Sequence, residues 1–482
     1  MRIPRLRAGL AVALLVIAGA ITGCDSLKTT DTPGVSTGAD NPFELSGSAS
    51  ASATGPTGPR TGVADTTMTA ENSDGGAIDK LSMNAMADMQ EYWTSRYSEN
   101  FPGVFAPVSR FISWDATAPK QQSIDFCRSN TAGQVNAAYC TVDPSIGWDR
   151  GVLLPELVKK FGPMSVVMVL AHEYGHSVQA QADLNGASTP SVVREQQGDC
   201  LAGVFLRYVA EGNSRHFTLN TTDGMNGVLG AAIAVRDREP GASKDEHGTA
   251  FERVTAIQMG YTDGAQTCKS ITRKELQQRR GTLPASYQPG EQTGQLAVDR
   301  ASLDLVAQAL AKNFPLGRAP AYDYGGVTTG CSNVTTTQQV SYCPSSDTIG
   351  ADIAALAKRA RGGDDSEILS SLVAGDYNAF VVFASRYMLA LQNDRKLALT
   401  GADTAGLRTA CLSGAFTTRL SLPESQLRLS ADDLDEAVSG LLSDGLAASD
   451  VNGNVVTSGF VRLEAFRTGV LDGDTACLTT YR

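Results

Sequence analysis

Apolar residues recur with a helical period along most of the chain. The spacing becomes helical from Ala77 onward, with an amphipathic stretch from Met83 to Tyr97 and an extended run from Val108 to Ser113 that predicts a strand. Residues Leu154 to Phe161 form another helical stretch. The pattern predicts an α+β fold that is mainly helical, with a few short strands.

Two prolines mark the starts of the next two helices. Pro163 opens a strongly apolar run that continues to about Ala182, and Pro190 opens a second run that carries Glu195 to Tyr208. Proline is favoured in the first helical turn because the N–H that it lacks would have no helical partner there. We therefore expect two consecutive helices joined by a short loop.

The chain also repeats itself. Short segments of its first half recur in the same order and at similar offsets in its second half: Ala138-Tyr139-Cys140 as Ser341-Tyr342-Cys343, Cys200-Leu201-Ala202-Gly203 as Cys411-Leu412-Ser413-Gly414, and Arg253 with Gly260 and Cys268 as Arg462 with Gly469 and Cys477. Repeated order at a fixed offset indicates an internal duplication. We expect two copies of one domain, at residues 79–285 and 290–482.

The N-terminus has the pattern of an export signal in residues 1–23. Three arginines precede an uncharged apolar run from Ala8 to Thr22, which is short for a membrane span. The run ends in Ile21-Thr22-Gly23-Cys24, which resembles a bacterial lipobox, so Cys24 is the expected lipidation site. The alternative is an ordinary cleaved signal peptide. Lipidation would anchor the protein to the cell membrane on its extracytoplasmic face.

Residues 24–78 are rich in small and polar side chains, which predicts a disordered tether.

The formal net charge of the chain is −11. Binding to phosphates requires a basic face, and none is visible in the sequence, so we expect no nucleic acid partner.

The sequence His172-Glu173-Tyr174-Gly175-His176 carries the strongest chemical signal. Histidines four residues apart project from one face of a helix and can bind one metal ion together. A zinc ion held by two imidazoles and one carboxylate keeps a position open for water, and Glu173 can take the proton of that water as general base. The alternative is a pair of histidines that simply pack on an amphipathic helix.

The next predicted helix offers a third ligand. Glu195 and Asp199 lie one turn apart there. Glu195 can reach the metal, while Asp199 can accept the ring N–H of His172 or His176 and fix the orientation of that ring. Such an acidic pair is otherwise common on solvated helix faces.

With these residues the chain resembles the neutral zinc metallopeptidase family of bacteria, in the broad group with HExxH plus glutamate typified by thermolysin. The matching residues cover the first copy almost end to end: Ala138-Tyr139-Cys140 with Asp143, Val169 to His176 with Val178-Gln179, Glu195 with Asp199 to Gly203, and Glu246 to Thr249 with Arg253, Gly260 and Tyr261. The family usually has histidine where this chain has Ser177 and alanine where it has Gly198.

The resemblance implies a zincin-like domain that hydrolyses peptide or protein substrates. It also gives His247 a role in stabilising the oxyanion or binding substrate. The alternative is that His247 caps or packs locally at a helix start. His216 matches nothing in the family and is expected on the surface, in a turn.

The second copy lacks the family's residues at the positions that zinc binding requires. Ser385, Leu389 and Gly406 fall at the positions of the three metal ligands, and none is a credible zinc ligand. We therefore expect one zinc per chain and a degenerate, metal-free second copy.

The eight cysteines that follow Cys24 form an even set in a chain expected to be exported, which suggests disulfides. Because they fall at matching places in the two copies, we expect four pairs: Cys127 with Cys140, Cys200 with Cys268, Cys331 with Cys343, and Cys411 with Cys477.

The whole pattern favours a lipid-anchored zinc metalloendopeptidase. A non-catalytic envelope lipoprotein that acts as a binding scaffold is the alternative.

Overall fold

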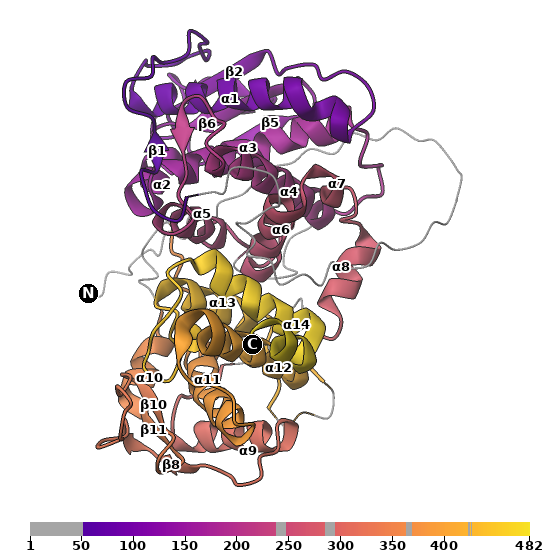
Figure 1. Cartoon of the computed structure of the whole chain (residues 1–482). Helices are drawn as coiled ribbons and strands as arrows, with labels where there is room; N and C mark the ends of the chain where they lie inside the picture. The colour runs from indigo at the N-terminus through magenta and orange to yellow at the C-terminus, as the bar shows by residue number, and fades with distance from the viewer. Residues whose placement is uncertain (1–51, 238–246, 285–294, 363–368, 423–424, 426) are drawn as a thin grey trace, which may run out of the picture.

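The computed structural model describes residues 52–237, 247–284, 295–362, 369–422, 425 and 427–482. They form two halves that stack on each other, with the N-terminal half at the top of Figure 1 and the C-terminal half at the bottom. The prediction of an α+β fold that is mainly helical is confirmed. The expected export signal and the lipidation site Cys24 lie outside the described residues.

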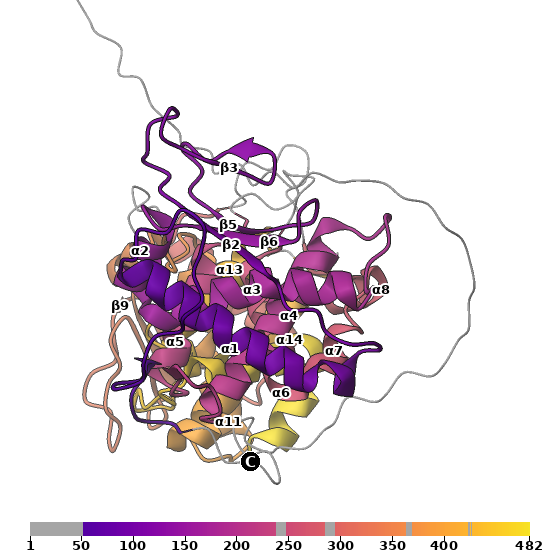
Figure 2. The same cartoon turned by 90° about the horizontal axis from the view of Figure 1, so that it is seen from above.

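The N-terminal half contains a three-stranded sheet, two two-stranded pairs and a group of packed helices. In chain order its main elements are α1 (Ala77–Asn100), β2 (Arg110–Trp114), β5 (Ala137–Cys140), β6 (Ser145–Asp149), α2 (Leu153–Phe161), α3 (Pro163–Gln181), α4 (Ser191–Ala210), α5 (Asp223–Ala234), α6 (Ala250–Asp263), α7 (Ala265–Cys268) and α8 (Arg273–Arg280). Helix α1 packs against α3 on the outside of this half (Figure 2). The predicted strand and helices are present, with ends shifted by a few residues.

The sheet of this half has the strand order β2-β6-β5. Strand β2 pairs with β6 in parallel, while β5 and β6 form an antiparallel hairpin. A separate two-stranded hairpin joins β3 (Asp125–Phe126) and β4 (Ser129–Asn130). Strand β5 lies at the edge of the sheet and next to α3.

The C-terminal half follows the same order of elements. Its main elements are α9 (Arg300–Asn313), β8 (Ala321–Asp323), β9 (Gly325–Gly326), β10 (Val340–Cys343), β11 (Thr348–Asp352), α10 (Ile353–Ala360), α11 (Tyr377–Asp394), α12 (Leu407–Leu420), α13 (Asp433–Ser443) and α14 (Gly459–Thr480). Strand β8 is parallel to β11, as β2 is to β6. Strand β10 is antiparallel to β11, as β5 is to β6.

The two halves meet where α5 and α6 face α13 and α14 (Figure 1). The Tyr261 and Phe460 rings contact each other with centroids 5.1 Å apart. The buried amide of Gln258 donates to the Phe460 carbonyl at 3.0 Å, and Asn226 exchanges hydrogen bonds with Thr457 and Gly459. The interface therefore combines apolar packing with directed hydrogen bonds.

The prediction of a disordered tether is wrong for residues 52–78. Strand β1 (Gly58–Pro59) pairs antiparallel with β7 (Phe217–Thr218), and the Thr66 amide donates to the Asn84 side chain at 2.8 Å. Ala70 is buried in the core. Backbone pairing holds this segment although it has few large apolar groups, so the first domain begins before residue 79. Residues 24–51 lie outside the described part of the chain.

All four predicted disulfides are present, joining Cys127 to Cys140, Cys200 to Cys268, Cys331 to Cys343 and Cys411 to Cys477. The Cys200–Cys268 bridge links α4 to α7, the short helix that directly follows α6, and Cys411–Cys477 links α12 and α14. Each of the helix pairs α4 with α6 and α12 with α14 also has glycines where the two backbones come close. A side chain at Gly203 would overlap the Ile257 carbonyl, and one at Gly414 would overlap the Phe466 carbonyl.

We expect loss of the Cys200–Cys268 bridge to destabilise the protein more than loss of Cys127–Cys140. The first bridge spans 68 residues and the second 13. A disulfide stabilises the fold because it restricts the unfolded chain, by about 4 kcal/mol for the longer loop and about 3 kcal/mol for the shorter one. Urea unfolding of the two double serine variants measures the difference, and a larger loss for the shorter loop would contradict this ranking.

No helix in the described ranges is long and apolar enough to cross a membrane.

Candidate metal centre

Helix α3 carries the two histidines of the HEYGH segment. The helix begins at Pro163 and is apolar on most of its surface, which buries it between α1, α2, α4 and α5. Its period places the His172 and His176 rings on one face, edge to face with centroids 4.7 Å apart. His172 is buried, and His176 is the more accessible of the two, with 18% of its side chain exposed.

Helix α4 brings Glu195 to the same point. Its Oε2 atom lies 3.1 Å from Nε2 of His172, and its Oε1 atom lies 3.7 Å from Nε2 of His176. The two Nε2 atoms are themselves 3.1 Å apart. The predicted trio is therefore brought together, with its potential ligand atoms all within 4.8 Å of one another.

These distances fit a zinc ion. Tetrahedral bonds of 2.0 to 2.1 Å place neighbouring ligand atoms about 3.3 Å apart. The Nδ1 atom of His172 faces the Asp199 carboxylate at 2.8 Å, and Nδ1 of His176 faces the Gln179 side-chain oxygen at 3.0 Å. Both rings then carry a proton on Nδ1 and direct an Nε2 lone pair toward the Glu195 carboxylate. Three converging acceptors require a cation between them, either a proton or a metal ion.

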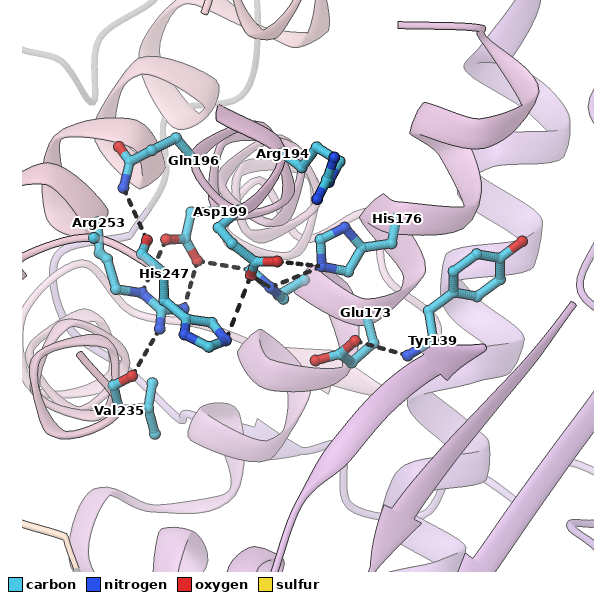
Figure 3. Close-up of polar contacts among 12 residues, drawn as sticks. Tyr139, Glu173, His176, Arg194, Gln196, Asp199, Val235, His247 and Arg253 are labelled. Carbon is cyan, nitrogen blue, oxygen red and sulfur yellow. Dashed lines mark hydrogen bonds and ion pairs between the residues drawn. The ribbon is translucent and has the colours of Figure 1, made fainter. Parts of the chain in front are cut away.

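A buried ion pair holds the His172 ring in place. Asp199 is fully buried on α4, and Arg253 from α6 donates to both of its oxygens, at 2.8 and 2.9 Å. Arg253 also donates to the Val235 carbonyl at 2.9 Å (Figure 3). Asp199 thus accepts the ring N–H of His172, one of the two alternatives predicted from the sequence, and fixes its orientation.

The electrostatics of the cluster follow from burial and opposite charge. Burial alone lowers the pKa of His172, but the carboxylates of Asp199 and Glu195 raise it to about 10. Burial alone raises the pKa of Glu195, but His176 and His172 hold it well below its usual range. The imidazoles and the carboxylates of the cluster therefore stabilise one another's charged forms.

Glu173 lies beside the helix face that carries His172 and His176, next to the edge strand β5. Its Oε2 atom accepts the backbone N–H of Tyr139 at 2.8 Å (Figure 3). The side chain is largely buried, and burial raises its pKa. A carboxylate with a raised pKa that is held by one backbone donor is suited to accept and return a proton.

His247 reaches the cluster from the segment before α6. Its Nε2 atom lies 3.9 Å from Oε2 of Glu195, and its Nδ1 atom lies 3.2 Å from an oxygen of Asp237. Asp237 also accepts the backbone N–H groups of His247 and Gly248, at 2.7 and 2.8 Å. His247 is thus aimed at the cluster by a carboxylate, which favours its predicted role over local capping. The cap of α6 is Thr249.

The prediction for His216 is wrong. The residue is 5% exposed, and its Nδ1 atom and its backbone N–H both bond to Asp88 of α1. Asp88 is 128 residues away in the chain. His216 ties the segment before β7 to α1 and is not part of the group formed by His172, His176 and Glu195.

A second group of potential ligands lies in the C-terminal half and consists of Asp376, Asp433 and Glu436. It contains only carboxylates. Burial raises the pKa of Asp376 to about 6, and it raises the pKa values of Asp433 and Glu436 well above their usual range. Their oxygens already accept protein donors, among them the amides of Leu296 and Tyr377. These carboxyl groups are therefore engaged in hydrogen bonds within the C-terminal half.

Sequence reasoning gave no role to Gln179, Asp237 or Arg253, although Gln179 was among the residues that match the family. Gln179 lies one turn after His176, so helical spacing could have identified it as the partner of that ring. Asp237 had no such signal, because its contact with His247 depends on how the chain returns from α5 to α6. Arg253 was noted only as a family match, without its role as the partner of Asp199.

The chain is similar to uncharacterized proteins of Mycobacterium bovis and Mycobacterium tuberculosis. The match is 31% identical over 170 residues and covers 30% of this chain and 58% of each relative. The chain therefore spans a little over half the length of these relatives. No family model and no solved structure matches the chain.

Proposed function

We propose that the protein is a zinc-dependent metalloendopeptidase with one metal site, in its N-terminal half. The observation that carries the proposal is the convergence of His172, His176 and Glu195, whose potential ligand atoms lie within 4.8 Å of one another. Two imidazoles and one carboxylate form a common ligand set of catalytic zinc sites, which leave a fourth position for water or substrate. Carboxylate-rich magnesium and calcium sites have a different composition.

Zinc at this site would act as a Lewis acid that lowers the pKa of a water molecule to about 7 and polarises the substrate carbonyl. Glu173 is positioned to take the proton of the attacking water and to deliver it to the leaving amine. The Tyr139 amide holds Glu173 in place during this transfer. His247, held by Asp237, is placed to donate a hydrogen bond to the oxygen on which negative charge develops.

We further propose that the N-terminal half is a zincin-like domain and the C-terminal half its degenerate copy. Three observations support this: the shared order of elements, the matching disulfides, and the glycines where α4 comes close to α6 and α12 to α14. In the second copy Ser385 and Arg386 stand where the first has His172 and Glu173. The Arg386 guanidinium is buried and donates to the Leu446 carbonyl and to Ser449.

The proposed setting is the extracytoplasmic face of the cell membrane, with the chain anchored through a lipid on Cys24. The basic and apolar N-terminus and the lipobox pattern support this placement. The four disulfides agree with export, because disulfides persist in oxidising compartments.

Cleavage of denatured casein tests the proposed activity. We expect hydrolysis by the purified protein, loss of hydrolysis after treatment with a chelator, and recovery on addition of zinc. Hydrolysis that survives removal of all metal would contradict the proposal. Bound zinc without any hydrolysis would favour the non-catalytic scaffold.

A further inference from the structure

One carboxylate of the C-terminal half reaches into the N-terminal half beside the segment that carries His247. Asp435 lies on α13 and is 1% exposed. Its Oδ1 atom accepts the backbone N–H of Phe251 at 3.1 Å, and the Ala250 amide also donates to the carboxylate. Its Oδ2 atom lies 3.4 Å from Nε of Arg236.

These three partners flank the residues that aim His247. Arg236 directly precedes Asp237, whose carboxylate contacts the backbone and the ring of His247. Ala250 and Phe251 are the first two residues of α6, three and four positions after His247. Asp435 thus contacts the chain both just before Asp237 and just after His247.

The surroundings of Asp435 suit a carboxylate. Burial raises its pKa, and Arg236 together with the amides of Ala250 and Phe251 limits the rise to about 6. A negative charge at the start of α6 is favourable because the first amides of a helix point outward and carry partial positive charge. A buried charge persists only when it is paired in this way.

Other contacts complete the start of α6. Thr249 and Glu252 form a reciprocal capping box, which satisfies the amides of both residues. Asp435 satisfies the two amides between them. The first turn of α6 is therefore fully bonded only when α13 of the other half is in place.

We propose that Asp435 is a positioning residue of the metal site: the degenerate half holds His247 in its working orientation through Arg236 and the start of α6. The kinetic part of this inference rests on the proposed peptidase function, whereas the structural part does not. The C-terminal half then completes the site of the N-terminal half without offering it a metal ligand.

The test compares full-length Asp435→Ala and Asp435→Asn with wild type by hydrogen exchange and kinetics. Backbone amides of residues 247–253 should exchange faster in Asp435→Ala, and less so in Asp435→Asn, whose amide oxygen can still accept from Phe251. Zinc content should stay unchanged. The value of kcat/KM should fall about 10- to 100-fold in Asp435→Ala, as expected for a misplaced group at an active site.

Two controls separate positioning from general damage. Asn226→Ala removes hydrogen bonds between the halves that join Asn226 to Thr457 and Gly459 and not to the His247 segment, so exchange in residues 247–253 should stay as in wild type. In a His247→Ala background, Asp435→Ala should lower kcat/KM by no more than about twofold further, because coupled residues are not additive.

Unchanged exchange in residues 247–253 of Asp435→Ala would overturn the inference, as would an equal rise in Asn226→Ala. A further 10- to 100-fold loss of kcat/KM when Asp435→Ala is added to His247→Ala would also overturn it. If the wild-type protein hydrolyses no peptide, the proposed function fails, and the exchange measurement still decides whether Asp435 orders this segment.

Discussion

Glu173→Gln is expected to keep the bound zinc and to lower peptide hydrolysis by about 100- to 10,000-fold, the usual contribution of general acid–base catalysis. Glutamine has nearly the same shape as glutamate, and its amide oxygen can still accept the Tyr139 N–H that holds Glu173 at 2.8 Å. It cannot take a proton from water. The loss should therefore appear in kcat, with zinc content and thermal stability close to those of wild type.

The matched control is Glu156→Gln on α2, where the carboxylate pairs with the exposed Lys159 at 3.1 Å and is not one of the residues of the cluster. That variant should hydrolyse substrate at the wild-type rate. If Glu173→Gln also does so, another group is the base, and the role assigned to Glu173 is wrong.

His172→Ala is expected to lose both the zinc and the activity. His172 lies at the centre of the cluster, with Nε2 3.1 Å from both His176 and Glu195. Its removal leaves two protein ligands, which is too few for a catalytic zinc site. It also leaves the buried Asp199 without the ring N–H that it accepts. The zinc affinity should fall by more than the roughly 10- to 100-fold typical of losing an outer hydrogen-bond partner.

His216→Ala provides the control for this variant. His216 is also a buried histidine bonded to an aspartate, Asp88, but it lies outside the metal cluster. We expect this variant to be less stable than wild type and to retain its zinc. Zinc retained by His172→Ala, as measured by metal analysis after dialysis, would show that the metal is held elsewhere.

The parts of the site that depend on local spacing could be predicted from the sequence. His172 and His176 share a helix face because they are four residues apart, and Glu195 and Asp199 share one for the same reason. That the two helices meet was inferred from the need for a third ligand and from the position of Glu195 on the helix that directly follows. The disulfides were predicted because the cysteines recur at matching places in the two halves.

Contacts between distant segments could not be predicted in the same way. His216 was expected on the surface because nothing near it in the sequence explains its burial, and its partner Asp88 is 128 residues away. Residues 52–78 were expected to be disordered because their composition offers little apolar surface. Their order comes from backbone pairing with β7 and from side-chain amides, which hydrophobic patterns do not reveal.

The contact between Asp435 and the start of α6 could not be predicted from the sequence either. It joins residues that are 184 positions apart, and it exists only because α13 packs on α5 and α6. An aspartate in a helix is ordinarily taken for a solvated residue. Only its burial in the assembled fold distinguishes Asp435.

The central claim is that each chain binds one zinc ion, at His172, His176 and Glu195. Both other histidines, His216 and His247, lie in the N-terminal half, so the C-terminal half has no imidazole of its own to offer. Its carboxylates Asp376, Asp433 and Glu436 form no nitrogen- or sulfur-containing zinc site.

Metal content of the purified full-length chain, measured by mass spectrometry after removal of loosely bound ions, tests this claim directly. We predict one zinc per wild-type chain and less than about 0.1 in His172→Ala, a ratio that follows from the expected loss of affinity. No zinc in the wild-type chain, or two tightly held zinc ions, would contradict the account.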